Sequence, residues 1–321
     1  MLSNLTIVVP CYNEEQVLLE TNKQLTSIIN DQIVQKLIGS DSRILYVDDG
    51  SYDNTWSIIE QLSDESSIVT GLKFSRNFGH QNALLAGLEM ASKHANMAIT
   101  IDADLQDDVN IIPRMVEAYS NGNDVVYAVR NNRDTDTFFK RKTAELFYGT
   151  MKKMGVDMIP NHADYRLMSN RAIKGLLKYS ERNLFLRGIV PLIGYQSTKV
   201  YYARKKRFAG TSKYPLKKML SFAMDGITSF SIAPIRMIMY LGVLIVLMSV
   251  GLMIYTLVSH VLGNVTPGWS SLMISIWFIG GVQLLALSVL GEYIGKIFTE
   301  TKKRPRFEIE KDKYSSSFKN D

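Results

Sequence analysis

Short apolar runs alternate with longer amphipathic stretches over the first 230 residues of the chain. The apolar runs cover residues 5–9, 43–47, 97–101 and 124–129, and the stretches with helical spacing cover residues 14–30, 54–62, 81–94 and 111–121. Strands separated by helices are typical of βαβ units, whose strands lie parallel in one sheet. The pattern predicts an α/β domain over residues 1–230, and such domains bind ligands at the carboxyl ends of their strands.

The pattern changes after Pro234, where two long apolar stretches follow one another. Residues 237–259 and 261–291 carry no charged side chain, and each stretch is long enough to supply the ~20 residues that cross a bilayer core. The connecting turn, residues 260–270, has no Lys or Arg, whereas basic residues flank both stretches: Lys213, Lys217, Lys218 and Arg236 before them, and Lys296, Lys302, Lys303, Arg304 and Arg306 after them. By the positive-inside rule, both termini are then cytoplasmic.

This arrangement predicts three parts: a cytoplasmic domain (1–230), a two-helix transmembrane domain (234–296) and a cytoplasmic tail (297–321). We expect the tail to be extended and available for pairing with another subunit. Between the first two parts, residues 138–155 and 214–230 interleave Lys and Arg with aromatic residues and Met. This pattern favours amphipathic helices that lie on anionic lipid. Ordinary soluble helices packed on the sheet are the alternative.

Composition narrows the class of protein. Among 321 residues, 46% are hydrophobic and 21% are charged, so global disorder is excluded. The net charge of +6 suits nucleic acid, an anionic bilayer or a phosphate-bearing substrate. The basic residues cluster beside the membrane segments, which argues against nucleic acid. Cys11 is the single cysteine, so it cannot form an intramolecular disulfide, and we expect it to be a packing residue.

An acidic segment follows directly after the third apolar run, in the sequence Asp102-Ala103-Asp104-Leu105-Gln106-Asp107. Two carboxylates at i and i+2 and an amide oxygen at i+4 can converge on a hard divalent cation. Such a cation neutralises a nucleoside diphosphate as it leaves. Acidic loops are common, so this segment alone is weak support for a metal site. Asp107 and Asp108 are interpreted as a helix-start signal.

Polar motifs also follow the other runs. They are VVPCYNEE (residues 8–15), VDDGS (47–51), NFGHQNALLAG (77–87), DYRL (164–167) and RFAGTSKY (207–214). Tyr12 is suited to stack on a base, Glu14 to accept hydrogen bonds from ribose hydroxyls, and Asp48 to bind a base imide. His80 is suited equally to contact a phosphate or to cap the following helix.

The ordered combination of these motifs resembles the family-2 glycosyltransferases of the GT-A fold. More narrowly, it is similar to the branch that makes polyprenyl-phosphate sugars, which includes dolichol-phosphate mannose synthase and bacterial undecaprenyl-phosphate glucosyltransferases. The resemblance covers essentially the whole chain. It implies a Rossmann-like nucleotide-sugar-binding domain followed by interfacial helices and two transmembrane helices.

The resemblance also implies roles for residues at matching positions. The nucleotide-sugar ligands would be Pro10, Tyr12, Glu14, Asp48 and Asp102, and the metal ligands Asp102, Asp104 and Gln106. The catalytic residues would be Asp104, Asp164 and Arg207, and the lipid-phosphate ligands Arg130, Arg141, Thr143, Ser212 and Lys213. Relatives carry a serine shortly after the position of Arg141, whereas here Thr143 is followed by Ala144. The hydroxyl ligand in that helix is therefore open.

The implied activity is an inverting transfer of glucose from UDP-glucose to undecaprenyl phosphate. It would depend on Mg²⁺ or Mn²⁺ and take place at the cell membrane, in a homo-oligomer for which a tetramer is one option. UDP-GlcNAc or another donor, a polysaccharide or glycolipid synthase and a non-catalytic membrane adaptor are the alternatives. No QxxRW segment of a processive synthase is found, and the carboxylates that an adaptor would lose are present.

Physical chemistry qualifies the role of Asp164. A phosphate monoester has its second pKa near ~6 and is largely ionised at neutral pH. An acceptor of this kind needs little help from a base, unlike a sugar hydroxyl. We therefore expect Asp164 to orient Arg166 or the acceptor more than to remove a proton.

Overall fold

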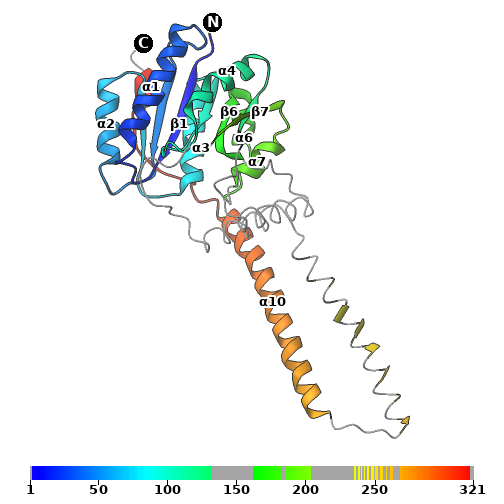
Figure 1. Ribbon diagram of the computed structural model, residues 1–321. Helices are drawn as coiled ribbons and strands as arrows, with labels where there is room; N and C mark the ends of the chain where they lie inside the picture. Colours follow the sequence, from blue (N-terminus) through cyan, green and yellow to red (C-terminus); the bar gives the residue numbers. More distant parts are fainter. Residues whose placement is uncertain are drawn as a thin grey trace.

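One mixed sheet forms the centre of the N-terminal domain (Figure 1). The computed structural model describes residues 2–131, 162–182, 185–203 and 268–318, with scattered positions between 235 and 262. The eight strands lie in the order β7-β5-β6-β4-β1-β2-β3-β8. Their bounds are Leu5–Cys11 (β1), Arg43–Asp48 (β2), Val69–Phe74 (β3), Met97–Thr100 (β4), Val125–Arg130 (β5), His162–Ser169 (β6), Ser197–Tyr202 (β7) and Ile309–Asp312 (β8).

The direction of the strands corrects the expected parallel sheet. Strands β1, β2, β3 and β4 are parallel. The βαβ pattern predicted this for β1, β2 and β4, whereas β3 is not among the predicted strands. Strand β6 is antiparallel to both of its neighbours, β4 and β5, and β8 is antiparallel to β3 at one edge. Because β6 runs backwards, its first residues lie at the same edge as the last residues of β4.

Helices cover both faces of the sheet. Their bounds are Leu18–Val34 (α1), Thr55–Glu65 (α2), His80–His94 (α3), Ile112–Ser120 (α4), Asn170–Leu177 (α6) and Leu186–Leu192 (α7), with a short 3-10 helix η1 at Val109–Ile111. One core cluster joins α1, α2 and α4 to Ile7 and Val9 of β1, and a second joins α3, α6 and α7 to Val8. Alternate side chains of β1 thus pack into two buried layers, one on each face of the sheet, as expected for a strand covered on both faces.

Helix α1 begins four residues later than the periodicity predicts. Asn13 has a φ of 54°, a left-handed conformation that interrupts a helix. The backbone N–H groups of Glu14 and Glu15 donate to side chains beyond β2, at 2.9 Å to Thr55 and 3.3 Å to Asp53. The segment before Leu18 is therefore held as a loop by contacts that are distant in sequence.

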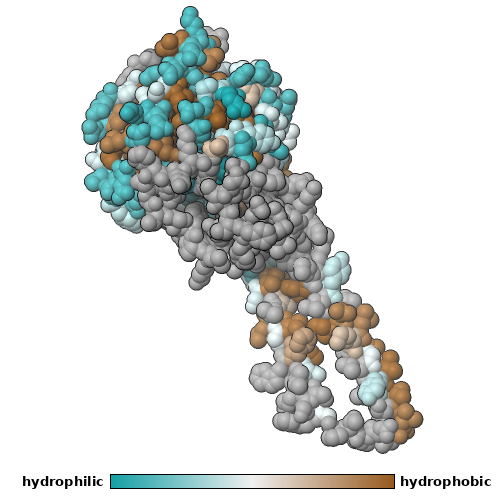
Figure 2. Space-filling model, viewed as in Figure 1, coloured by the Kyte–Doolittle hydropathy of each residue, from teal (hydrophilic) through white to brown (hydrophobic). Residues whose placement is uncertain are grey.

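Helix α10 spans Trp269–Lys302 and projects away from the sheet (Figure 1). The part from Phe278 to Lys302 is long and apolar enough to cross a membrane. Large apolar side chains along it are exposed, including Phe278, Leu284 and Ile294, each more than 60% accessible. Figure 2 shows hydrophobic residues along this arm. Exposed apolar side chains on such a helix suit lipid rather than water.

The bounds of α10 differ from the predicted span, residues 261–291. The helix starts at Trp269, directly after Gly268, and continues eleven residues past Gly291. Glu292, Lys296 and Glu300 follow one another at i, i+4 spacing, and oppositely charged pairs at this spacing support a helix where it enters water.

Several predicted elements lie outside the described residues. These are the two interfacial helices, residues 138–155 and 214–230, and most of the first span, residues 237–259. The scattered positions described from Ile235 to Val261 are helical. The described residues therefore contain one candidate span, and both transmembrane helices remain predictions.

The tail after α10 returns to the sheet. Lys303 has a φ of 47° and ends the helix, and Ile309–Asp312 then pair with β3 as strand β8. Phe307 stacks on Phe74 with ring centroids 5.3 Å apart. Tyr314 is fully buried, and its hydroxyl lies 2.9 Å from that of Thr6. The expectation of an extended tail that pairs with another subunit is thus corrected, because the tail completes the edge of its own sheet.

We predict that Tyr314→Ala lowers the free energy of unfolding by about 3–5 kcal/mol, because it leaves a cavity the size of an aromatic ring in the second core cluster. Tyr314→Phe keeps the ring and loses only the contact with Thr6, so it should cost about 1 kcal/mol. Denaturant unfolding of the detergent-purified chain measures both. Equal losses would contradict a packing role, and a midpoint that depends on protein concentration would mean that the tail pairs between chains.

Candidate functional site

The loops that follow β1 and β2 form one unit at the carboxyl edge of the sheet. The N–H of Asn13 donates to Ser51 Oγ at 2.9 Å, and the Asn13 side chain accepts from the N–H of Tyr52 at 2.9 Å. Tyr12 lies edge-on to Tyr52, with centroids 6.3 Å apart, and Tyr52 is 85% exposed. Pro10 is buried at the end of β1. Two accessible aromatic rings thus flank the place where a base would stack.

Asp48 and Asp49 end β2 and have different partners. Asp48 is buried, and its Oδ1 accepts from the N–H of Ser51 at 3.2 Å. Its Oδ2 is buried without a hydrogen-bond partner among the described residues. Burial raises the pKa of Asp48, and Ser51 opposes this. An acceptor left open in this way fits the N–H of a base imide.

Asp49 instead anchors the loop before α3. Its carboxylate accepts from the N–H groups of Phe78, at 2.6 Å, and Gly79, at 2.9 Å. The next residue, Gly50, has a φ of 68°, and a Cβ there would lie 2.4 Å from the backbone of Arg76. A glycine is therefore required where the two loops touch. These contacts fix the first turn of α3, which begins with His80.

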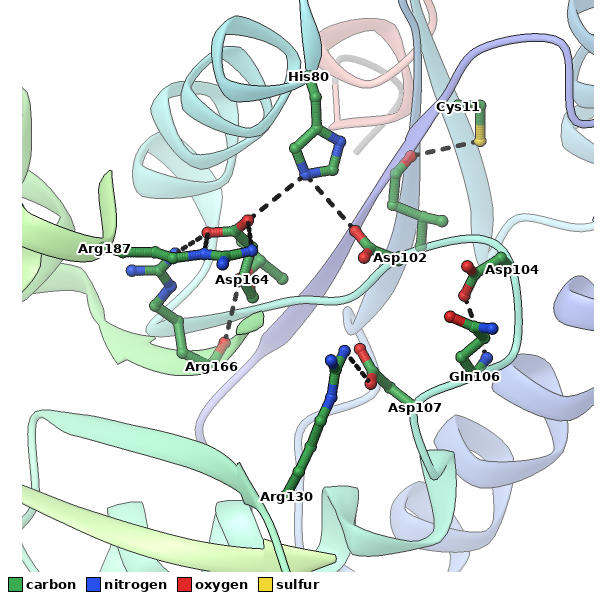
Figure 3. A network of polar contacts seen from close by, with 12 residues as sticks. Cys11, His80, Asp102, Asp104, Gln106, Asp107, Arg130, Asp164, Arg166 and Arg187 are labelled. Atoms are coloured by element: carbon green, nitrogen blue, oxygen red, sulfur yellow. Dashed lines mark hydrogen bonds and ion pairs between the residues drawn. The ribbon is translucent and has the colours of Figure 1, made fainter. Parts of the chain in front are cut away.

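The acidic segment leaves β4 as a tight loop. Oδ1 of Asp104 accepts from the N–H of Gln106 at 3.1 Å, and Leu105 between them has a φ of 55° (Figure 3). A left-handed leucine costs about 1–2 kcal/mol and persists only where surrounding contacts hold it. Leu105 is buried against the first core cluster, which provides these contacts. The loop is thus held in a strained shape beside Asp102.

Asp107 holds the far end of this loop. Its Oδ1 accepts from the Tyr202 hydroxyl at 2.5 Å and from Arg130 at 3.1 Å. Arg130 also donates to the Tyr202 oxygen at 3.1 Å. The predicted helix-start role is therefore wrong for Asp107, which is a buried ion-pair partner. It is confirmed for Asp108, whose side chain accepts from the N–H of Asn110 at the start of η1.

Asp164 lies opposite Asp102 because β6 is antiparallel to β4. Its carboxylate accepts from Arg166 at 2.7 Å and from Arg187 at 3.0 Å, and its backbone carbonyl accepts from the Thr100 hydroxyl. Burial by itself raises the pKa of Asp164, but Arg187, His80 and Arg166 outweigh it and hold that pKa well below its usual range. Asp164 is therefore ionised across the physiological range.

His80 lies between the two carboxylates (Figure 3). Its Nε2 is 3.5 Å from Asp102 and 3.8 Å from Asp164, and its side chain is 40% exposed. Desolvation lowers the pKa of His80, but the two carboxylates outweigh this and raise it to about 9. The ring is therefore a cation at neutral pH that stays accessible to a ligand.

Asp102 is paired with His80 through Oδ1, at an ion-pair distance of 3.5 Å. Desolvation raises its pKa to about 6, with nearby Asp107, Asp164 and Asp104 adding to the rise and His80 opposing it. Its Oδ1 is buried and accepts no hydrogen bond from the described residues. No three Asp, Glu, His or Cys side chains converge among those residues, so a cation here would take further ligands from a diphosphate or water. The carboxylates gathered around Asp102 fit a divalent cation, which would compete with His80 for Asp102.

The structure brings most predicted site residues to one edge and adds others. The acidic loop itself carries Asp102, Asp104 and Gln106, and Asp164 and Arg130 lie beside it (Figure 3). Arg187, Tyr202 and Asp49 were not predicted. The only sequence signal for Arg187 was a charge within the apolar run 185–193. The remaining predicted residues, Arg141, Thr143, Arg207, Ser212 and Lys213, lie outside the described residues.

Known proteins resemble this chain over nearly its full length. The uncharacterized glycosyltransferase YkoT of Bacillus subtilis is 54% identical over 97% of this chain and 92% of its own. The bactoprenol glucosyl transferase of Shigella phage SfV is 41% identical over 96% of this chain and 99% of its own. Among solved structures, glucosyl-3-phosphoglycerate synthase from Mycobacterium tuberculosis is similar with a TM-score of 0.46 and 15% identity, over 70% of this chain and 78% of that one.

The sequence profile of glycosyl transferase family 2 matches residues 6–178, which include β1 to β6 and the acidic loop. This match covers more than half of the chain, and it contains Asp48, Asp102, Asp104 and Asp164. The chain is a glycosyltransferase and belongs to family 2.

Proposed function

We propose that this enzyme transfers glucose from UDP-glucose to a polyprenyl phosphate, undecaprenyl phosphate, at the cell membrane. The observation that carries the proposal is the extent of similarity to the bactoprenol glucosyl transferase of phage SfV. It covers 96% of this chain and therefore includes the catalytic domain, most of α10 and part of the tail. A soluble acceptor would not require a helix long and apolar enough to cross a membrane.

The donor nucleoside binds between the loops after β1 and β2. Tyr12 stacks on the base, the open Oδ2 of Asp48 accepts from the base imide, and Glu14 binds the ribose hydroxyls. Pro10 shapes the floor of this site. The hydrogen bonds between the two loops hold these groups in place before the donor arrives, which reduces the entropy lost on binding.

Asp102, Asp104 and Gln106 hold a divalent cation, Mg²⁺ or Mn²⁺. When bound, the cation neutralises the diphosphate as it leaves the sugar. The clamp of Arg130 and Tyr202 on Asp107 keeps the loop that carries these ligands in one shape. The protonated His80 adds positive charge beside Asp102, where negative charge develops on the leaving group.

Asp164 positions cations and does not act as a base. A carboxylate whose pKa is held well below its usual range binds a proton too weakly for general-base catalysis. Its two oxygens instead fix Arg166 and Arg187. Arg187 is 31% exposed, so its guanidinium can contact a phosphate, whereas Arg166 is buried.

The acceptor phosphate attacks the anomeric carbon from the side opposite the diphosphate. One C–O bond forms while the bond to the diphosphate breaks, so the configuration inverts, and an ionised acceptor releases no proton. Arg141, Thr143, Arg207, Ser212 and Lys213 bind this phosphate, and Arg207 is catalytic in the sense that it contacts the reacting group. Arg130 contributes less to binding of this phosphate, because its charge is already neutralised by Asp107.

The enzyme is a multi-pass membrane protein that works as a homo-oligomer, for which a tetramer is one arrangement. Its catalytic domain and both termini lie in the cytoplasm. The basic residues on the domain side of α10 support this orientation, since they favour the cytoplasmic face. The product is a lipid-linked sugar on the cytoplasmic leaflet, which suits a later step of cell-envelope glycosylation.

The decisive experiment incubates membranes containing the enzyme with radiolabelled nucleotide sugars and undecaprenyl phosphate. We expect label to enter the organic phase with UDP-glucose, and EDTA to abolish it. Parallel reactions with UDP-GlcNAc test the donor. Transfer from another donor alone would refute the choice of glucose, and transfer that survives EDTA would refute the metal.

Asp104→Ala should reduce transfer by more than about 100-fold while the protein stays folded, because the cation loses a ligand beside the departing diphosphate. The matched control is Asp108→Asn, a change in the same segment that keeps a side chain able to cap η1. Transfer rates and melting temperatures measure both variants. Near-normal turnover of Asp104→Ala would refute its assignment.

Arg187→Ala should lower turnover by roughly 100-fold or more, because Asp164 then loses its partly exposed cationic partner, which is available to a substrate phosphate. Arg171→Ala is the matched control, since Arg171 also pairs with a buried carboxylate, Asp124, but is 67% exposed outside the site. We expect the control to change stability without changing kcat. Equal kcat losses in both variants would contradict a direct role for Arg187.

The orientation predicts that Asn264→Cys reacts with an impermeant thiol reagent in intact cells, because the turn between the spans is outside. Ser316→Cys in the tail should react only after the membrane is opened. Cys11 is 1% exposed and should contribute little background. Labelling of Ser316→Cys in intact cells would refute the topology.

A further inference from the structure

A basic cavity lies where α10 meets the catalytic domain. Its volume is about 240 Å³, and its lining includes Arg182, Lys302, Arg304 and Arg306, together with Asn82 and Phe298. A water molecule takes about 30 Å³ in the liquid, so the cavity accommodates a group the size of roughly eight waters. None of these residues belongs to the donor site described above.

Four cationic side chains line the cavity, and three carboxylates, those of Glu181, Glu300 and Glu89, lie near Arg306. Arg306 donates to the backbone carbonyls of Tyr179, at 2.6 Å, and Glu181, at 3.1 Å, which neutralise none of its charge. Burial and the neighbouring Arg182 lower the pKa of Arg306, with Glu181, Glu300 and Glu89 opposing. Its Nε is buried and has no hydrogen-bond partner among the described residues. A donor in this state requires an acceptor.

The cavity also lies at the end of the candidate span, where headgroups would lie if α10 crosses the membrane as proposed above. Phe298 and Lys302 belong to the last turns of α10, where the candidate span ends, and the Lys302 ammonium lies 4.0 Å from the Phe298 ring centroid. Lys303 then turns the chain in a left-handed conformation, so that Arg304 and Arg306 follow directly. Basic pockets at the cytoplasmic end of a membrane helix bind phosphate headgroups.

We propose that this cavity binds the phosphate of an anionic membrane lipid, separately from the acceptor that reacts. Asn82, which lines the cavity, is two residues after His80 on α3, and side chains at that spacing point in nearly opposite directions. A phosphate beside Asn82 is therefore on the other side of the helix from Asp102 and Asp164. The guanidinium groups hold the phosphate oxygens, and Phe298 contacts the glycerol and acyl carbons.

Such a lipid would stabilise the contacts between α10 and the segments that carry His80 and Arg187. The N–H of Arg182 donates to Glu300 of α10 at 2.7 Å, and Arg182 lies five residues before Arg187. The N–H of Leu186 donates to Gln81 of α3 at 2.9 Å. The residues that line the cavity are therefore connected, along the chain and through these hydrogen bonds, to His80 on α3 and Arg187 on α7. These are the two cations that face Asp164 from those helices.

The test measures binding of a fluorescent short-chain phosphatidylglycerol to the full chain in neutral detergent, without nucleotide sugar. We expect saturable binding of this lipid and none of the matching phosphatidylcholine. Lys302→Gln with Arg304→Gln should weaken binding roughly 30-fold, since each removes one charge at the headgroup. Because no transfer is measured, failure of this proposal is distinguishable from failure of the proposed reaction.

The control pair is Lys178→Gln with Lys303→Gln, which removes the same charge from exposed positions that do not line the cavity. It should change binding by less than about threefold, and melting temperatures show that both variants fold. Equal weakening in the two pairs would overturn the site in favour of general attraction to anionic lipid. Displacement of the lipid by equimolar inorganic phosphate would overturn the assignment to a membrane lipid, because the same oxygens would then come from a soluble anion.

Discussion

The buried carboxylate of Asp164 is the point on which the catalytic edge depends. It accepts from Arg166 on its own strand and from Arg187 on α7, and it faces His80 on α3. A charge buried at this depth is tolerated only when it is paired and hydrogen-bonded. The pairing therefore fixes three elements relative to one another, and it holds the partly exposed cations His80 and Arg187 beside the same carboxylate.

The acidic loop is held by a second, similar arrangement. A left-handed Leu105 leaves Asp104 and Gln106 on a tight turn, and Arg130 and Tyr202 hold Asp107 beyond it. Strain of this kind is common where a site must keep one shape before its ligand binds. The same contact explains why Arg130, expected to bind a lipid phosphate, is largely occupied within the protein. The Arg130 guanidinium stabilises the acidic loop through Asp107 more directly than it binds an acceptor phosphate.

Helix α10 contacts the catalytic domain through the residues on both sides of its C-terminal end. After α10, the chain turns at Lys303, Arg306 binds the carbonyls that follow α6, and β8 then closes the edge of the sheet. The loop held by Arg306 leads into α7 and so to Arg187. A short run of hydrogen bonds thereby connects α10 to the segment that leads to Arg187. A catalytic domain linked in this way is suited to a substrate whose phosphate stays at the membrane surface.

The sequence by itself determined the elements with strong local periodicity, among them β1, β2, β4, α3 and α4, because apolar spacing specifies which residues are buried. It also located the acidic loop and a long apolar helix that is a candidate span. Tertiary structure decided the rest. The antiparallel β6 places Asp164 opposite Asp102, and the tail pairs with β3 instead of another subunit. Arg187 and Tyr202 reach the site from α7 and β7, far away in sequence. Periodicity does not encode strand order or direction, since these depend on which distant backbone and charged groups satisfy one another.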